Sequence, residues 1–141
     1  MIYRRIIPIE FNHCDPAGIV FYPRYFEMTN SVVENFFDEV LGHSYAHMME
    51  ERRGVPTVRI EVDFRVPSRL GDKPEFRLEL LGVGRSSVRF QVSAWAGQTE
   101  RLCADLTLVY VNELGVADPW PDTIRNRMIA FKEGAANDNP A

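Results

Sequence analysis

The spacing of apolar residues changes once along the chain, and this change restricts the fold more than any other feature of the sequence. Between Tyr25 and Val40, apolar residues recur at three- and four-residue steps, which is typical of a helix with one broad apolar face. From Thr57 to Val66, apolar and polar residues alternate, which is typical of a strand with one solvated face. The sequence therefore predicts one long amphipathic helix that packs against strands.

Five strands are expected, and their connections favour antiparallel pairing. The predicted ranges are Arg4–Phe11, Thr57–Val66, Glu75–Val83, Ser87–Ala96 and Arg101–Val111. The turns between the last three strands are short, whereas a parallel crossover needs about a dozen residues. The simplest way to bury the helix is an α+β fold, with a five-stranded antiparallel sheet wrapped around it. Two shorter helices are expected at Tyr45–Arg53 and Asp122–Lys132.

The composition fits one small globular domain and argues against several classes of protein. A chain of 141 residues has room for a single domain, which we place at residues 1–133, followed by a disordered tail at 134–141. The net charge of −4 argues against nucleic-acid binding. No apolar run approaches the ~20 residues of a membrane span, and no secretion signal is evident. Cys14 and Cys103 provide no disulfide framework, so we expect a reducing, cytoplasmic environment.

The segment from Asp15 to Gly18 admits a structural and a functional interpretation. Asp, Pro and Gly at its first, second and fourth positions are the signature of a type I turn, so these residues alone favour a structural role. The functional interpretation depends on the residues that follow. A helix is expected to begin at Tyr22-Pro23, and tyrosine is a poor N-cap, so the first amides of the helix lack a side-chain partner.

Free amides at a helix N-terminus can stabilise an oxygen that acquires negative charge, because the positive end of the helix dipole lies there. The Asp15 carboxylate is only a few residues upstream, close enough in sequence to meet the same ligand. A carboxylate beside such donors can attack an acyl carbon, or activate water, while the donors hold the oxyanion. The pattern therefore indicates acyl chemistry at this loop.

Residues 14–26, with the sequence CDPAGIVFYPRYF, closely resemble the signature of the 4-hydroxybenzoyl-CoA thioesterase family. The agreement extends through GVPTVRIEVDF and SRLGD, with a matching strand order over residues 4–111. The resemblance implies the hotdog fold, homodimers or homotetramers, and hydrolysis of an acyl-CoA substrate without a metal or other cofactor. It implies that Asp15 is the catalytic carboxylate, that the Tyr22 backbone amide is the oxyanion donor, and that Pro16 and Gly18 shape the loop. We expect an aromatic or medium-chain acyl group.

Candidate binding residues are less sharply defined. The turn with Arg85 and Ser87 falls where relatives place basic residues against the nucleotide phosphates of CoA, although the serine between them is not basic. Asn30 borders the apolar stripe of the helix and could bind a polar acyl group, but a solvated helix residue is more common. His13 lies two residues from Asp15, on the same side of an extended chain, and could tune Asp15 or touch the substrate.

Two other groups of residues could suggest chemistry, but we expect neither to form a functional site. Cys14 and Asp15 point to opposite sides of an extended chain, so Cys14 is not expected to be the nucleophile. His43 and His47 have the spacing of two metal ligands on a helix, but Gly42 separates His43 from a regular helix and no glutamate occupies the zinc-protease position. A surface histidine pair is therefore expected, and no metal site is predicted.

Two rival functions remain open. A hotdog dehydratase or hydratase would need a positioned acid–base pair that usually includes histidine, and His13 is the only partner that the sequence offers. A non-catalytic acyl-CoA binding or sensing module would carry an effector segment such as a DNA-binding helix pair, which the sequence lacks. Release of free thiol from acyl-CoA would separate the three functions.

Overall fold

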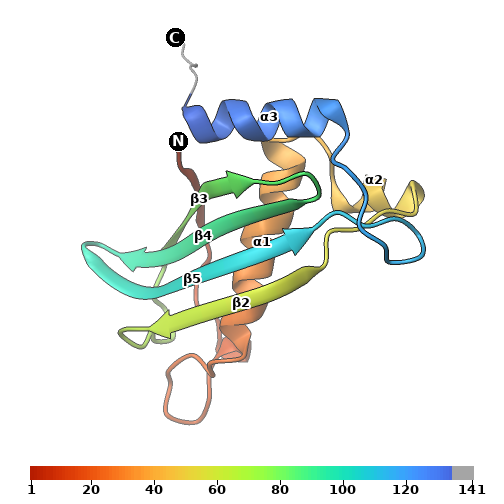
Figure 1. The fold of residues 1–141 in the computed structure, drawn as a ribbon. Helices are drawn as coiled ribbons and strands as arrows, with labels where there is room; N and C mark the ends of the chain where they lie inside the picture. The colour runs from red at the N-terminus through yellow and green to blue at the C-terminus, as the bar shows by residue number, and fades with distance from the viewer. Residues whose placement is uncertain (135–141) are drawn as a thin grey trace.

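The computed structural model of the protein describes residues 1–134, which form one sheet and three α-helices (Figure 1). In chain order, the elements are β1 (Tyr3–Ile6), the 3₁₀ turn η1 (Phe11–His13), α1 (Arg24–Glu39), α2 (Tyr45–Glu50), β2 (Thr57–Phe64), β3 (Glu75–Val83), β4 (Ser87–Ala96), β5 (Thr99–Val109) and α3 (Asp122–Glu133). All neighbouring strands are antiparallel, in the order β1-β3-β4-β5-β2. The predicted α+β architecture is confirmed. None of the helices in this part of the chain is both long and apolar enough to cross a membrane.

The core lies between α1 and the inner face of the sheet. The buried residues of α1 are Tyr25, Met28, Thr29, Val32, Val33, Phe36 and Phe37. In β3, β4 and β5, buried residues occupy every second position, as expected for strands with one inward face. The Phe36 ring packs edge-on against Phe90 of β4 and Phe131 of α3, with ring centroids 5.4 and 4.9 Å apart. This packing fixes the direction of α1 relative to the sheet.

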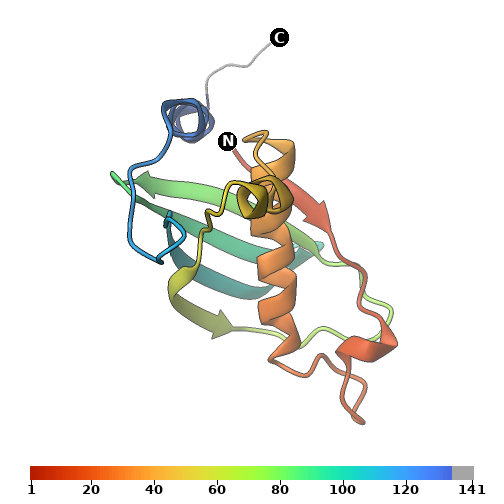
Figure 2. The ribbon, with the colours of Figure 1, turned by 90° about the vertical axis from the view of Figure 1, so that its right-hand side faces the viewer.

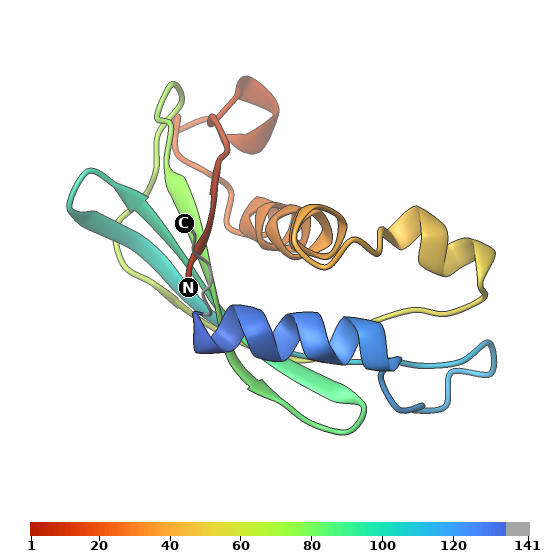
Figure 3. The ribbon, with the colours of Figure 1, turned by 90° about the horizontal axis from the view of Figure 1, so that it is seen from above.

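The closing helix α3 is present where the sequence predicted it. It packs against β3 and beside the C-terminal half of α1 (Figures 2 and 3). Its buried residues are Ile124, Met128 and Phe131. Gly134, with φ of +70°, caps the helix. The rest of the predicted tail, 135–141, lies outside the described residues.

The predicted first strand, Arg4–Phe11, is correct only in its first half. β1 ends at Ile6, two residues before Pro8, which has no amide hydrogen to donate to a ladder. The chain stays close to its neighbour beyond the proline, since the Ile9 amide donates to the Asp72 carbonyl at 2.8 Å. The η1 turn then bends the chain away from the sheet.

Other boundaries also differ from the prediction, and β2, which was expected to reach Val66, ends at Phe64. The helix expected over Tyr45–Arg53 ends at Glu50, because Arg52 adopts φ of +57° and reverses the chain. The strand expected over Arg101–Val111 begins and ends two residues earlier. Gly97, with φ of +63°, places the preceding turn at the predicted position, and pairing starts directly after it.

β2 departs most from the expectation of one buried and one solvated face. Its apolar series remains open to solvent, with Val58, Ile60, Phe64 and Val66 exposed by 59, 39, 48 and 41 %. The physical reason is its position, because β2 is one of the two edge strands of the sheet and pairs only with β5. An edge strand with exposed apolar side chains is a typical surface for association.

The first prediction concerns the core. Phe36→Ala should lower the free energy of unfolding by about 3–5 kcal/mol, because it removes a fully buried ring and leaves a cavity. Phe11→Ala is the control, since Phe11 is 83 % exposed and its loss should change stability by no more than about 0.5 kcal/mol. Urea unfolding measures both values. Similar losses in the two variants would contradict the assignment of the core.

The second prediction concerns assembly. We expect a dimer or larger assembly in dilute solution, because β2 exposes an apolar series at a sheet edge. Light scattering at micromolar concentration should give a mass well above the 16.2 kDa of the monomer. Ile60→Glu should lower this mass, whereas Arg59→Glu, on the other face of the same strand, should not. A wild-type mass near that of the monomer would exclude the assembly.

Candidate active site

The loop between β1 and α1 folds back on itself as a short two-stranded turn. An isolated antiparallel bridge joins Cys14 to Val20. The Gly18 amide donates to the Asp15 carbonyl at 2.9 Å, and Gly18 has φ of +78°, which residues with a Cβ rarely adopt. Asp15, Pro16 and Gly18 therefore occupy the tip of the turn, while its base leads into α1.

This turn is anchored to the segment between β2 and β3. The Val20 amide donates to the Ser68 carbonyl at 2.9 Å, and the Leu70 amide donates to the Gly18 carbonyl at 3.1 Å. The Ser68 amide in turn donates to the hydroxyl of Tyr25, on the buried face of α1, at 3.2 Å. The turn is thus held by both the helix and the segment SRLGD.

The Asp15 carboxylate is half-buried and has one oxygen engaged in the turn. Its Oδ1 accepts a hydrogen bond from the Ala17 amide at 2.9 Å, the geometry of an Asx turn. Its Oδ2 has no hydrogen-bond partner within residues 1–134. One oxygen therefore shapes the loop, and the other is available to a ligand.

The Tyr22 amide lies at the base of the turn, where α1 begins. Its neighbours are paired, since the Phe21 amide donates to the His13 carbonyl at 2.9 Å and the Arg24 amide donates to the Phe21 carbonyl at 2.8 Å. The Tyr22 amide has no acceptor among the residues that the structure describes, and Pro23 at the N-cap provides no side-chain cap. A free donor therefore stands at the positive end of the helix dipole.

The side chains of His13 and Cys14 form hydrogen bonds with the backbone of Glu10. The His13 Nδ1 accepts a hydrogen bond from the Glu10 amide at 2.9 Å within the η1 turn. The Cys14 thiol donates to the Glu10 carbonyl at 3.5 Å and packs against the core. Neither side chain forms a hydrogen bond with the Asp15 carboxylate in the described part of the chain.

An aromatic cleft of about 230 Å³ lies beside the base of the turn. The Phe64 ring, from the end of β2, stands 6.0 Å from the Tyr22 ring and 5.8 Å from the Tyr25 ring. Arg101 of β5 also lines the cleft, and its buried Nε has no partner among residues 1–134. Sequence reasoning missed Phe64 and Arg101, because no local spacing connects β2 and β5 to a loop before α1.

Asn30 lies two turns along α1 from Tyr22, at the junction of two further clefts. One cleft, of about 340 Å³, includes Tyr45 of α2, and the other, of about 210 Å³, includes Ile60 of β2. Burial raises the pKa of Tyr45, and the charge of Glu34 acts in the same direction, so its hydroxyl remains protonated at neutral pH. Asn30 is exposed, which is compatible with solvation or with contact to a bound ligand.

Arg85 and Ser87 lie on the hairpin between β3 and β4, far from this loop. The Arg85 carbonyl accepts a hydrogen bond from the Trp120 amide at 3.0 Å, which holds the hairpin near the start of α3. In Figures 1 and 2, the hairpin lies beside α3, far from the Asp15 turn, which precedes the N-terminal end of α1. Within one chain, the structure does not bring Arg85 and Ser87 together with Asp15.

Comparisons with solved structures identify the fold. A thioesterase from Thermus thermophilus, solved with coenzyme A and zinc, is 26% identical, with 94% of this chain and 96% of that chain covered and a TM-score of 0.78. A 1,4-dihydroxy-2-naphthoyl-CoA thioesterase from Synechocystis is 14% identical, with coverage of 92% and 96% and a TM-score of 0.83. A Staphylococcus aureus protein solved with CoA is 11% identical, with coverage of 100% and 90% and a TM-score of 0.89.

The family assignment comes from the sequence as a whole. No curated protein sequence matches the chain. Residues 9–128, however, match the Thioesterase-like superfamily, and this range includes the Asp15 turn, all of α1 and strands β2 to β5. The α+β hotdog fold expected from the sequence is therefore confirmed, and the chain belongs to the Thioesterase-like superfamily.

Proposed function

We propose that this protein hydrolyses an acyl-CoA thioester to the free acid and CoA. The observation that carries the proposal is that an Asp15 carboxylate oxygen on the turn and the Tyr22 amide at its base, where α1 begins, both lack a hydrogen-bond partner among residues 1–134. Family membership and the thioesterases among the structural neighbours support this reaction class. The motif CDPAGIVFYPRYF favours, within the superfamily, the 4-hydroxybenzoyl-CoA thioesterase type.

In the proposed reaction, Asp15 acts as nucleophile or as general base. As nucleophile, its Oδ2 attacks the thioester carbon, the CoA thiolate leaves, and water hydrolyses the resulting anhydride. As general base, it removes a proton from a water molecule that attacks the same carbon. In both routes the Tyr22 N–H donates to the oxyanion of the tetrahedral intermediate, where the helix dipole adds to the stabilisation. The protein groups suffice for either route, and coenzyme A is part of the substrate.

We propose an aromatic or medium-chain acyl group. The aromatic cleft formed by Tyr22, Tyr25 and Phe64 lies beside the proposed oxyanion donor, and its walls are mostly apolar. A flat ring or a short alkyl chain would bury apolar surface there, at about 25 cal/mol per Å². Asn30, beside the two further clefts, is a candidate contact for a polar group on a longer acyl chain.

We assign the CoA end of the substrate to Arg85 and Ser87, which lie beside the start of α3. The Arg85 guanidinium has no ion-pair partner in the described residues. It therefore suits a phosphate, because a guanidinium can bind two phosphate oxygens at once. The separation from Asp15 within one chain means that the Arg85 of a second copy is the better candidate. The proposal therefore includes a homodimer or homotetramer as the active form.

Two observations weigh against the rival functions. A dehydratase or hydratase would need a histidine close to Asp15, yet His13 uses its Nδ1 to accept from the Glu10 amide. A sensing module would need an effector segment, and residues 1–134 consist of the hotdog elements alone. Cys14 and Cys103 are free thiols, in accord with the proposed cytoplasmic location.

The third prediction tests the role of Asp15. Asp15→Asn should remain folded and oligomeric, because the amide oxygen of asparagine can still accept from the Ala17 N–H. Its kcat for acyl-CoA hydrolysis should fall at least ~10²-fold, since asparagine is neither a base nor a useful nucleophile. Thiol release from a panel of acyl-CoA substrates measures the change.

The matched control is Asp38→Asn, which alters an exposed carboxylate on α1 and should leave kcat unchanged. The Asp15→Asn protein must be freshly prepared, because deamidation would restore the carboxylate. A folded Asp15→Asn variant that retains more than about a tenth of the wild-type kcat would show that Asp15 only shapes the turn.

The fourth prediction concerns the nucleotide end of the substrate. Arg85→Ala should raise KM for acyl-CoA and leave kcat nearly unchanged, which is the pattern of lost uniform binding. The loss should correspond to about 1.5–3 kcal/mol, the usual contribution of a well-made hydrogen bond to a charged group. An acyl-pantetheine thioester lacks the nucleotide and should be insensitive to the substitution. Equal effects on both substrates would refute the assignment.

A further inference from the structure

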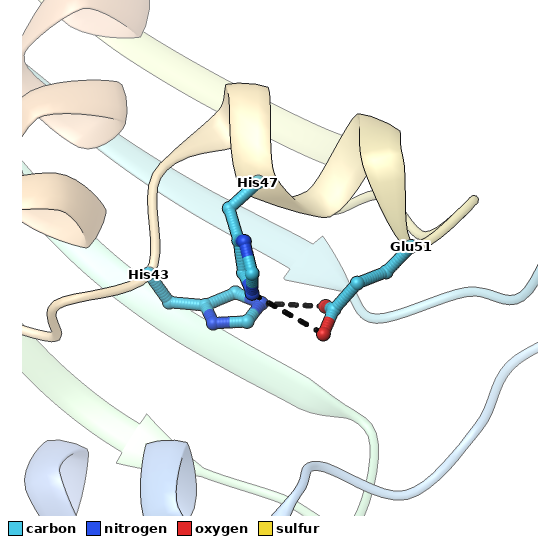
Figure 4. Close-up of side chains that lie close together, drawn as sticks. All are labelled: His43, His47 and Glu51. Atoms are coloured by element: carbon cyan, nitrogen blue, oxygen red, sulfur yellow. Dashed lines mark hydrogen bonds and ion pairs between the residues drawn. The ribbon is translucent and has the colours of Figure 1, made fainter.

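His43, His47 and Glu51 come together on one side of α2 (Figure 4). The His43 Nε2 lies 3.0 Å from Glu51 Oε1, and the His47 Nε2 lies 3.3 Å from Glu51 Oε2. The two imidazole rings stand 4.7 Å apart and nearly perpendicular, at 88°. One potential ligand atom from each residue lies within 4.8 Å of the other two. Two ring nitrogens and a carboxylate therefore converge on one small volume.

The backbone holds His43 and His47 in this arrangement. α1 ends at Glu39, and Gly42, with φ of +65°, then turns the chain, so that the His43 amide donates to the Phe37 carbonyl at 2.8 Å. Ser44 then caps α2, because its hydroxyl oxygen accepts from the His47 amide at 3.1 Å. His43 lies outside both helices, as the sequence predicted from Gly42, yet its ring still reaches the ring of His47. The glycine starts a turn that delivers His43 to the face of the next helix.

Glu51, at the other end of α2, provides the third potential ligand. It follows His47 by four residues, so one helical turn brings its carboxylate beneath the imidazole. The position expected for a glutamate from zinc proteases lies between two histidines and is occupied here by other residues. For that reason the sequence pattern did not reveal this ligand.

The spacing of these atoms matches the demands of a tetrahedral metal. Zinc binds histidine nitrogen and glutamate oxygen at about 2.0–2.1 Å, so neighbouring ligand atoms of a tetrahedron stand about 3.3 Å apart. The two nitrogen–oxygen separations, 3.0 Å to Oε1 and 3.3 Å to Oε2 of Glu51, are close to this length, so both imidazoles lie within reach of an ion held by the carboxylate. Imidazole suits zinc and other late transition metals, whereas calcium and magnesium prefer oxygen ligands alone.

We propose that His43, His47 and Glu51 bind a zinc ion that fastens the turn after α1 to the far end of α2. Coordination through Nε2 requires the ring proton on Nδ1, and the Nδ1 of His47 faces the Glu50 carboxylate at 3.7 Å. The fourth position of the metal is left for water. The site lies at the end of α1 opposite the Asp15 turn, and none of its three residues takes part in the proposed hydrolysis (Figure 1).

The test is direct metal binding by the full chain after removal of metals with a chelator. Zinc titration should show one equivalent bound per chain and a higher Tm, because the ion binds the folded arrangement only. Cobalt, as a spectroscopic substitute, should give the visible absorption of a tetrahedral ion without a cobalt–thiolate band. A thiolate band would instead place the metal on Cys14 or Cys103 and overturn the proposal.

Single substitutions distinguish this site from adventitious binding. His47→Ala and Glu51→Gln should each weaken zinc binding at least about tenfold, because loss of an outer-shell partner alone often costs that much and each variant removes a direct ligand. Both side chains are about half exposed, so these variants should fold, and circular dichroism verifies it. His13→Ala, which removes the remaining histidine of the chain, is the matched control and should bind zinc like the wild type.

Two outcomes would refute the site. One is an unchanged zinc affinity in His47→Ala and Glu51→Gln, which would place the metal elsewhere. The other is the absence of any zinc-dependent Tm shift in the wild type, which would show that Glu51 only accepts hydrogen bonds from two surface histidines. Zinc removal should leave kcat for acyl-CoA unchanged, so failure of this proposal is distinguishable from failure of the thioesterase proposal.

Discussion

The burial of one face of α1 against the sheet is the interaction on which the rest of the structure depends. Phe36 and its aromatic neighbours fix the axis of the helix, and the N-terminus of that helix is where the Tyr22 amide stands. The buried Tyr25 hydroxyl accepts from Ser68, whose carbonyl accepts from Val20 in the Asp15 turn. The packing that stabilises the fold thus also positions both groups of the candidate site.

The Asp15 turn shows that a structural and a chemical role are compatible in one side chain. Its Oδ1 closes the Asx turn with Ala17, while its Oδ2 has no partner in the described chain. The type I turn signature and the thioesterase motif are therefore not competing interpretations of the same four residues. The hydrogen bond restricts the rotation of the carboxylate, which lowers the entropic cost of presenting Oδ2 to a ligand.

Much of the fold was predictable because local patterns determine it. The helical spacing of apolar residues from Tyr25 predicted α1. The short turns after β3 and β4 predicted that β3, β4 and β5 are antiparallel neighbours. Properties that depend on distant partners were not predictable. No local pattern reveals that β2 is an edge whose apolar series stays exposed, that Phe64 borders the candidate site, or that Arg85 is held beside the start of α3.

The strand order also determines where the entropic cost of folding falls. The central pairings of β3, β4 and β5 close short turns, whereas β1 must pair Tyr3 with Leu78, and β2 must pair Phe64 with Leu102. Loop-closure entropy is therefore concentrated at the two edges of the sheet. The Asp15 turn lies between β1 and α1 and is anchored just beyond β2. The order of the candidate site therefore depends on the two strand pairings that close the longest loops of the sheet.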